Sequence, residues 1–204
     1  MLTVGKDALE VERKLRDGRL VCPLCNGRLA PWSHARRRIM FGDGWVRWRL
    51  RPRRARCAGC GVTHVLLPVN VLVRRRDEVG VIGAALALAA EGLSCEVVAR
   101  SVGRPVGLVR GWIGRLAGRA EWVRVVFTRL VVALDPDPPP IEVACSPLAE
   151  AVAAIAEAAA AAGRRFVCAV SPWELAAAVT VGSLLAPSMD TAFVTGSINT
   201  NHIL

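Results

Sequence analysis

Four cysteines form two well-separated Cys-x2-Cys pairs, Cys22 with Cys25 and Cys57 with Cys60. Four thiolates are the number that closes a tetrahedral structural zinc site. Asn26-Gly27 follows the first pair and Gly61 the second, and these residues tolerate the positive φ of a metal-binding knuckle. We therefore predict that the four cysteines bind one Zn²⁺ ion. Reduced structural thiols and redox chemistry are the alternatives, and redox chemistry is disfavoured because no βαβ pattern surrounds either pair.

Positive charge is concentrated at the front of the chain. Residues 1–130 hold 25 Lys and Arg against 10 acids, whereas residues 131–204 hold 2 against 7. Arg outnumbers Lys 25 to 2, which suits bidentate phosphate recognition and is also what a GC-rich coding sequence produces. This asymmetry predicts that the basic residues 1–130 bind a polyanion and that the acidic residues 131–204 have another role.

The segment 45–51 alternates between apolar residues and arginines at a period of two. Val46, Trp48 and Leu50 share one face, so we expect a half-buried strand whose exposed face is a row of guanidinium groups. Such a run is usually a solvated face, but a charge density this high repels itself unless a polyanion neutralises it. We predict contacts with nucleic-acid phosphates from Arg36, Arg37, Arg38, Arg47, Arg49, Arg51, Arg53 and Arg54.

Aromatic and imidazole side chains lie among these arginines. We expect Trp32, Trp45 and Trp48 to belong to the core of this part and not to form base-stacking platforms. Since four cysteines already complete a zinc site, we expect His34 and His64 to be surface or packing residues.

Three helices are predicted over residues 75–120. Asp77 is the expected N-cap of the first, Ser94 opens the second, and the third begins at Val106. The last two have the spacing of a helix-turn-helix, with a small residue at Ala99 and a turn at Gly103.

The third helix is the expected recognition helix of this unit. Arg110, near its start, has the hydrogen-bonding groups to read a guanine edge. Arg104, Arg115 and Arg119 are expected to contact backbone phosphates.

The flanking regions are also expected to contain helices. Asp7 begins a capping box, which predicts a short helix within residues 1–18. Residues 121–145 are read as a helix end and a Pro-rich linker. A C-terminal helical region rich in Ala follows over residues 146–186, and a mobile tail is expected over residues 187–204.

The N-terminal sequence, the cysteines and the apolar runs indicate in which cellular compartment the chain is expected. No secretory signal is recognisable at the N-terminus, and reduced cysteines together with zinc predict the cytoplasm. The charge-free run Leu175–Met189 is interrupted by Gly182 and Pro187, and it is shorter than the roughly 20 apolar residues that a membrane span needs. We therefore expect no membrane association.

Together these features predict an α+β, multi-part chain. A small β zinc ribbon over residues 19–68 precedes the helix-turn-helix unit and the Ala-rich helical C-terminal region. Four stretches also resemble known proteins: Cys22–Cys25, Trp32–Arg36, Leu50–Gly61 and Thr63–Pro68. They resemble an uncharacterised family of high-GC bacterial proteins that joins a zinc ribbon to a helix-turn-helix. More loosely, they are similar to the zinc-binding head of insertion-sequence transposases. This resemblance covers residues 19–120 and implies DNA binding, with the same four cysteines as zinc ligands.

The leading hypothesis is a non-enzymatic, zinc-dependent protein that binds duplex DNA, either a regulator or a transposase-derived accessory factor. Metal-dependent strand transfer needs several carboxylates around two metal ions, and the seven acids after Leu130 fall mostly in a linker or on helix surfaces. One alternative is a truncated or partner-dependent transposase or recombinase subunit. Another is a protein–protein adaptor, and the C-terminal region is a candidate homodimer contact.

Overall fold

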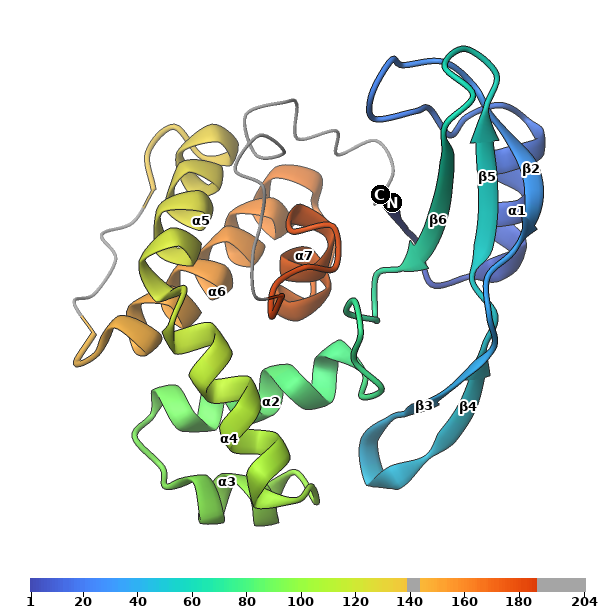
Figure 1. Ribbon diagram of the computed structural model, residues 1–204. Helices are drawn as coiled ribbons and strands as arrows, with labels where there is room; N and C mark the ends of the chain where they lie inside the picture. Colours follow the sequence, from blue (N-terminus) through green and yellow to red (C-terminus); the bar gives the residue numbers. More distant parts are fainter. Residues whose placement is uncertain (139–143, 187–204) are drawn as a thin grey trace.

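The computed structural model describes residues 1–138 and 144–186, and its class is α+β, as predicted (Figure 1). The strands are β1 (Leu2–Val4), β2 (Leu29–His34), β3 (Arg38–Phe41), β4 (Arg47–Leu50), β5 (Arg53–Cys57) and β6 (Thr63–Pro68). The helices are α1 (Ala8–Arg16), α2 (Val79–Ala90), α3 (Cys95–Ser101), α4 (Val106–Ala117), α5 (Ala120–Leu134), α6 (Pro147–Phe166) and α7 (Pro172–Val179). The predicted tail and residues 139–143 of the predicted linker lie outside the described residues. In the part that is described, no helix combines the length and the apolar character of a membrane crossing.

A four-stranded sheet in the order β1-β6-β5-β2 forms the N-terminal part. β1 pairs in parallel with β6, and the other neighbours are antiparallel. The sequence had not predicted β1, because three residues carry no usable periodicity and the partner strand lies more than sixty positions away. β1 becomes a strand only because β6 offers it a free edge.

The short helix predicted within residues 1–18 is α1, and it packs against this sheet. Asp7 is its N-cap, and its Oδ1 accepts a hydrogen bond from the N–H of Leu9 at 2.9 Å. The predicted capping box is incomplete, because Glu10 forms ion pairs with Arg13 and Lys14. The buried side chains that join α1 to the sheet are Val11, Leu15, Leu20, Leu29, Ala55 and Leu66.

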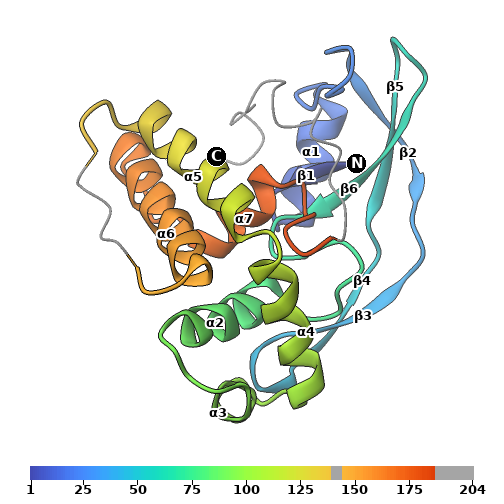
Figure 2. The ribbon, with the colours of Figure 1, turned by 60° about the vertical axis from the view of Figure 1, so that its left-hand side comes forward.

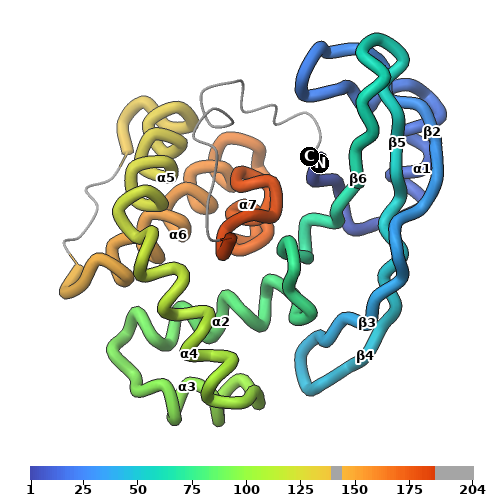
Figure 3. The backbone as a smooth tube through the Cα atoms, viewed as in Figure 1, coloured from blue at the N-terminus to red at the C-terminus, as the bar shows by residue number. Residues whose placement is uncertain are grey.

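β3 and β4 form a separate two-stranded ladder that continues the hairpin made by β2 and β5. The N–H of Ala35 donates to the carbonyl of Pro52 at 2.8 Å, so the two ladders follow one another along a single long hairpin. We call residues 38–51 the hairpin arm. Figure 3 shows that it extends from the sheet toward α2, α3 and α4.

The hairpin arm confirms the predicted alternation only in part. Trp48 is half-buried and Leu50 is buried, whereas Arg47 and Arg49 are exposed. The strand begins two residues later than predicted, however, because Asp43–Trp45 forms a short 3-10 helix at the tip. Val46 therefore lies outside the strand and is exposed.

The helices α2, α3 and α4 agree closely with the predicted three-helix unit. Ser94 caps α3 by accepting a hydrogen bond from the N–H of Val97, and Gly103 has φ +62 in the turn before α4. Ala99 and Val109 are buried at the crossing of α3 and α4. The cap of α2 was predicted one residue too early, since Glu78 is the N-cap and Asp77 is buried in another contact.

Helices α5, α6 and α7 complete a helical core that also includes α2 and α4. Figure 2 shows α5 lying along α6. Sequence reasoning treated residues 121–145 as a helix end and linker and so missed α5 as a full helix. Alanines on α6, including Ala154 and Ala158, are buried against Phe127 and other apolar residues of α5, and their small size lets the two helices approach closely. α6 continues to Phe166 and ends where Val167 takes φ +53.

Candidate metal centre and basic surfaces

The four cysteines predicted as metal ligands converge at one end of the sheet. Their Sγ atoms all lie within 4.8 Å of one another and form a group that could hold a metal ion. Cys25 and Cys57 have their Sγ atoms 3.4 Å apart, and the Sγ atoms of Cys22 and Cys60 are 3.8 Å apart. Sulfurs that bind one tetrahedral ion at about 2.3 Å are separated by about 3.8 Å. The spacing of this cluster therefore fits a four-coordinate site with no open position.

Each cysteine pair lies on a tight turn of the predicted kind. Asn26 has φ +56 and Gly61 has φ +71, in the left-handed region that both residue types tolerate. A Cβ on Gly27 would lie 3.0 Å from the Sγ of Cys57, so the approach of the two turns requires glycine at this position. The turns thus bring the two sulfur pairs together.

Backbone N–H groups surround the sulfur of Cys57. The N–H groups of Gly59 and Cys60 donate to this sulfur at 3.3 and 3.5 Å. The N–H of Cys60, together with contacts from the Cys25 thiol and Gly59, lowers the pKa of Cys57 to about 6. Because thiolates are the metal-binding form, these N–H groups favour the ionised form of Cys57. The pKa of Cys60 is raised to about 11 although the N–H of Val62 lowers it, because the neighbouring thiols and burial oppose a second charge in the cluster.

His64 on β6 lies directly behind the cluster. It is buried, and its Nε2 is 3.3 Å from the Sγ of Cys22. Burial lowers the pKa of His64, which keeps the ring neutral near pH 7. With Cys22 as a thiolate, Nε2–H donates to sulfur and orients this ligand, as groups behind metal ligands commonly do. The sequence had predicted a surface or packing role for His64, and only the pairing of β6 with β5 shows its second role.

The arginines predicted on the hairpin divide into exposed and engaged groups. Exposed side chains without a carboxylate partner among the described residues are Arg36, Arg37, Arg47, Arg49 and Arg51. Arg38 is half-buried, and its Nε has no hydrogen-bond partner. Arg53 pairs with Glu12 at 3.0 Å, and Arg54 is half-buried, so these two are less accessible to a ligand.

The structure contradicts the predicted role of Arg104 as a phosphate contact. Its side chain is fully buried and its Nε donates to Asp77 at 2.6 Å. Arg110 is exposed on α4 and makes a 3.3 Å contact with Glu96 on α3. Arg115 is also exposed, and it donates to the carbonyl of Gly111. Arg110 and Arg115 therefore remain candidates for nucleic-acid contacts, whereas Arg104 does not. Arg119 is half-buried and its Nη1 donates to the carbonyls of Ser183, Leu184 and Ala186, so it is less accessible to a phosphate.

Two of the three tryptophans expected in the core are at the surface. Trp32 is 56% exposed, because the register of β2 against β5 shifts between Pro31 and Ser33 and takes Trp32 out of the ladder. Trp45 is 47% exposed, because it lies in the turn at the hairpin tip and not in β4. His34 is exposed, as predicted.

A scan against protein-family models, a search of curated proteins and a search of solved structures each found no significant match. The resemblance to proteins that join a zinc ribbon to a helix-turn-helix therefore stays a prediction. The function of this chain must be argued from its own cysteine cluster, charge distribution and helix geometry.

Proposed function

We propose that this chain is a non-enzymatic, zinc-dependent DNA-binding protein. The observation that carries the proposal is the cluster of four cysteine sulfurs within 4.8 Å of one another. Four thiolates in tetrahedral arrangement favour Zn²⁺ over harder divalent ions, which prefer oxygen ligands. With four protein ligands no position is left for a substrate or water, so the metal has a structural role.

Zinc would stabilise the sheet that carries the hairpin arm. The sulfurs flank the long hairpin in the sequence, because Cys22 and Cys25 precede β2, its first strand, and Cys57 ends β5, its last strand. A bound ion therefore closes the base of this hairpin and limits its fraying. Binding free energy at such a site contributes directly to folding.

The hairpin arm supplies the first proposed DNA contact. Arg47, Arg49 and Arg51 are exposed and have no acidic partner among the described residues. Guanidinium groups in this state bind phosphate oxygens in bidentate fashion. Because the contacts are with phosphates, they add affinity without sequence preference.

The helices α3 and α4 supply the second proposed contact. We infer that they form a helix-turn-helix with α4 as the recognition helix, supported by buried Ala99 and Val109 and the left-handed Gly103. Arg110 and Arg115 lie on the exposed surface of α4. The tip of the hairpin arm is hydrogen-bonded to the turn before α4, so the two contacts have a fixed relation and can engage one duplex together.

The test combines metal analysis with DNA binding. Elemental analysis of the purified chain should give one zinc per chain, and fluorescence anisotropy with a blunt duplex should show affinity that falls steeply with salt. Removal of zinc with a chelator should weaken duplex binding, and adding zinc back should restore it. A protein that purifies without zinc, or whose duplex affinity is absent or independent of salt, would contradict the proposal.

A further inference from the structure

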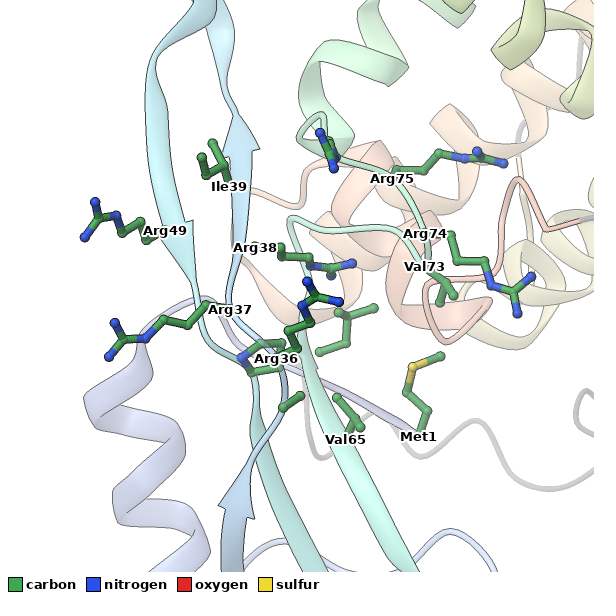
Figure 4. A pocket seen from close by; sticks show the side chains of 14 residues that line it. Met1, Arg36, Arg37, Arg38, Ile39, Arg49, Val65, Val73, Arg74 and Arg75 are labelled. Carbon is green, nitrogen blue, oxygen red and sulfur yellow. The ribbon is translucent and has the colours of Figure 1, made fainter.

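A cavity of about 800 Å³ lies between the root of the hairpin arm and the segment that leads into α2. Seven of the fourteen residues that line it are arginines, and none is acidic. Residues 36–38 and Arg49 contribute from the hairpin, and residues 74–76 contribute from the facing segment. Figure 4 shows this arrangement. Two arginine groups that are distant in sequence therefore share one concave site.

The positive charge of this cavity has no carboxylate partner in the part of the chain that the structure describes. None of the seven arginines forms an ion pair within residues 1–138 and 144–186. By contrast, Arg53, Arg104 and Arg124 each have a carboxylate partner elsewhere in the molecule. The Nε atoms of Arg38 and Arg75 are buried and have no hydrogen-bond partner. Burial lowers the pKa of Arg38, which is the sign of a cation held without compensation.

The side chains of the cavity point in defined directions. In Figure 4, Arg36 and Arg38 extend from the hairpin toward the segment that carries Val73 and Arg74, whereas Arg37 and Arg49 extend the opposite way. Arg75 is turned toward the helical body and donates to the carbonyl of Leu185 at 2.9 Å. Arg74 also extends away from the hairpin in Figure 4, so the residues most available to a ligand inside the cavity are Arg36 and Arg38 from the hairpin and exposed Arg76 from the facing segment.

Both walls of the cavity are held by backbone hydrogen bonds. The N–H of Phe41 donates to the carbonyl of Arg76 at 2.7 Å, and the N–H of Val73 donates to the carbonyl of Gly182 at 2.8 Å. Arg74 has φ +59, which turns this segment sharply at the cavity wall. The charged groups are thus gathered before a ligand arrives, and this lowers the cost of ordering them on binding.

We propose, on the basis of the DNA-binding function above, that this cavity binds the phosphodiester backbone of a single nucleic-acid strand, such as an overhang beside a duplex. A volume of about 800 Å³ falls within the range of small-ligand sites, about 300–1,000 Å³, so it accepts a few nucleotides of one strand and not a duplex. No aromatic side chain lines the cavity to stack on bases. Recognition is therefore through phosphates and independent of sequence.

The experiment compares a blunt duplex with the same duplex carrying a short single-stranded overhang. Anisotropy titrations of the zinc-loaded chain should show that the overhang raises affinity about tenfold or more. The variant Arg36→Ala/Arg38→Ala/Arg76→Ala removes three charges from the cavity. We expect this variant to lose the preference for the overhang, measured as the ratio of its affinities for the overhang duplex and the blunt duplex.

The matched control removes the same charge elsewhere. Arg19, Arg129 and Arg165 are exposed and do not line the cavity, so Arg19→Ala/Arg129→Ala/Arg165→Ala should keep the overhang preference. Equal loss of preference in both variants would show an effect of net charge alone and overturn the proposal. An unsubstituted chain that binds blunt duplex without any overhang preference would overturn the cavity site and leave the DNA-binding function standing. Absence of all duplex and overhang binding would overturn both.

The cavity could take its phosphate groups from a nucleic-acid strand or from a free polyphosphate, and tripolyphosphate distinguishes these two ligands. As a competitor it should reduce the overhang preference while having little effect on blunt-duplex binding. If tripolyphosphate binds the unsubstituted chain and not the cavity variant, while the overhang adds no affinity, the cavity takes a free polyphosphate and the strand proposal is wrong.

Discussion

The guanidinium group of Arg104 donates from Nε to a carboxylate oxygen of Asp77 at 2.6 Å, and both residues are buried. The Nη2 of Arg104 also donates to the carbonyl of Gly42 at 2.6 Å, and the ring of Trp45 lies 4.2 Å from the guanidinium carbon. This one side chain therefore joins the turn before α4, the entry to α2 and the tip of the hairpin arm. It fixes the hairpin arm against the helices.

Replacing Arg104 by Ala should destabilise the protein by about 3–5 kcal/mol, because Asp77 would then be a buried charge without a partner. The measurement is urea unfolding followed by circular dichroism. Arg110→Ala is the control, since its pair with Glu96 is exposed and such pairs contribute little to stability. Similar unfolding midpoints for the two variants would show that the buried pair has no special role.

Gly83 on α2 should not tolerate a side chain. A Cβ at this position would lie 2.1 Å from the ring of Trp173 on α7, so Gly83→Ala must separate the two helices. We expect a loss of about 1–3 kcal/mol, the usual cost of overpacking a core. On the same helix Gly80 has open space around its Cβ position, and Gly80→Ala should be neutral or stabilising by up to about 1 kcal/mol. Thermal unfolding of the two variants tests this difference in stability. If Gly83→Ala is as stable as Gly80→Ala, the prediction is wrong.

His64 should affect metal affinity without binding the metal. Its Nε2 contacts the Sγ of Cys22, and loss of a group that orients a ligand typically weakens metal binding by about 10–100-fold. Competition with a chromogenic zinc chelator measures this change in His64→Leu. His34→Leu is the matched control, because His34 is exposed on β2 and is predicted to leave zinc affinity unchanged. If His64→Leu retained full affinity, its contact with Cys22 would be packing alone.

The exposed arginines of the hairpin arm should set the salt dependence of duplex binding. Each phosphate contact contributes about 0.9 to the slope of log affinity against log salt, so Arg47→Ala/Arg49→Ala/Arg51→Ala should reduce its magnitude by about 2–3. Anisotropy titrations with a blunt duplex at several salt concentrations give this slope. The Arg19, Arg129 and Arg165 triple variant should leave the slope near that of the unsubstituted chain. An unchanged slope in the hairpin variant would place the duplex elsewhere, or favour an adaptor role for this face.

Much of the local structure could be predicted from the sequence. The caps Asp7, Ser94 and Ser171 accept hydrogen bonds from nearby N–H groups, and each such contact lies within three residues of the cap. The period-two pattern of β4 and the left-handed turns beside the cysteines are also local features. The spacing alone also predicted which four sulfurs form the metal site. Each Cys-x2-Cys turn already places two sulfurs side by side, so the fold has only to bring the two turns together.

Residue types and short spacings were enough to identify the cysteine set, most helix starts and the excess of positive charge. Which of these charges are available to a ligand depends on contacts between distant parts of the folded chain. Arg104 and Asp77 are 27 positions apart, and Arg36 and Arg74 line one cavity although 38 positions separate them. No periodic pattern encodes such pairings. Folding buries Arg104 against Asp77, whereas within residues 1–138 and 144–186 it brings no carboxylate to the cavity arginines. The state of each charge therefore depends on its folded surroundings.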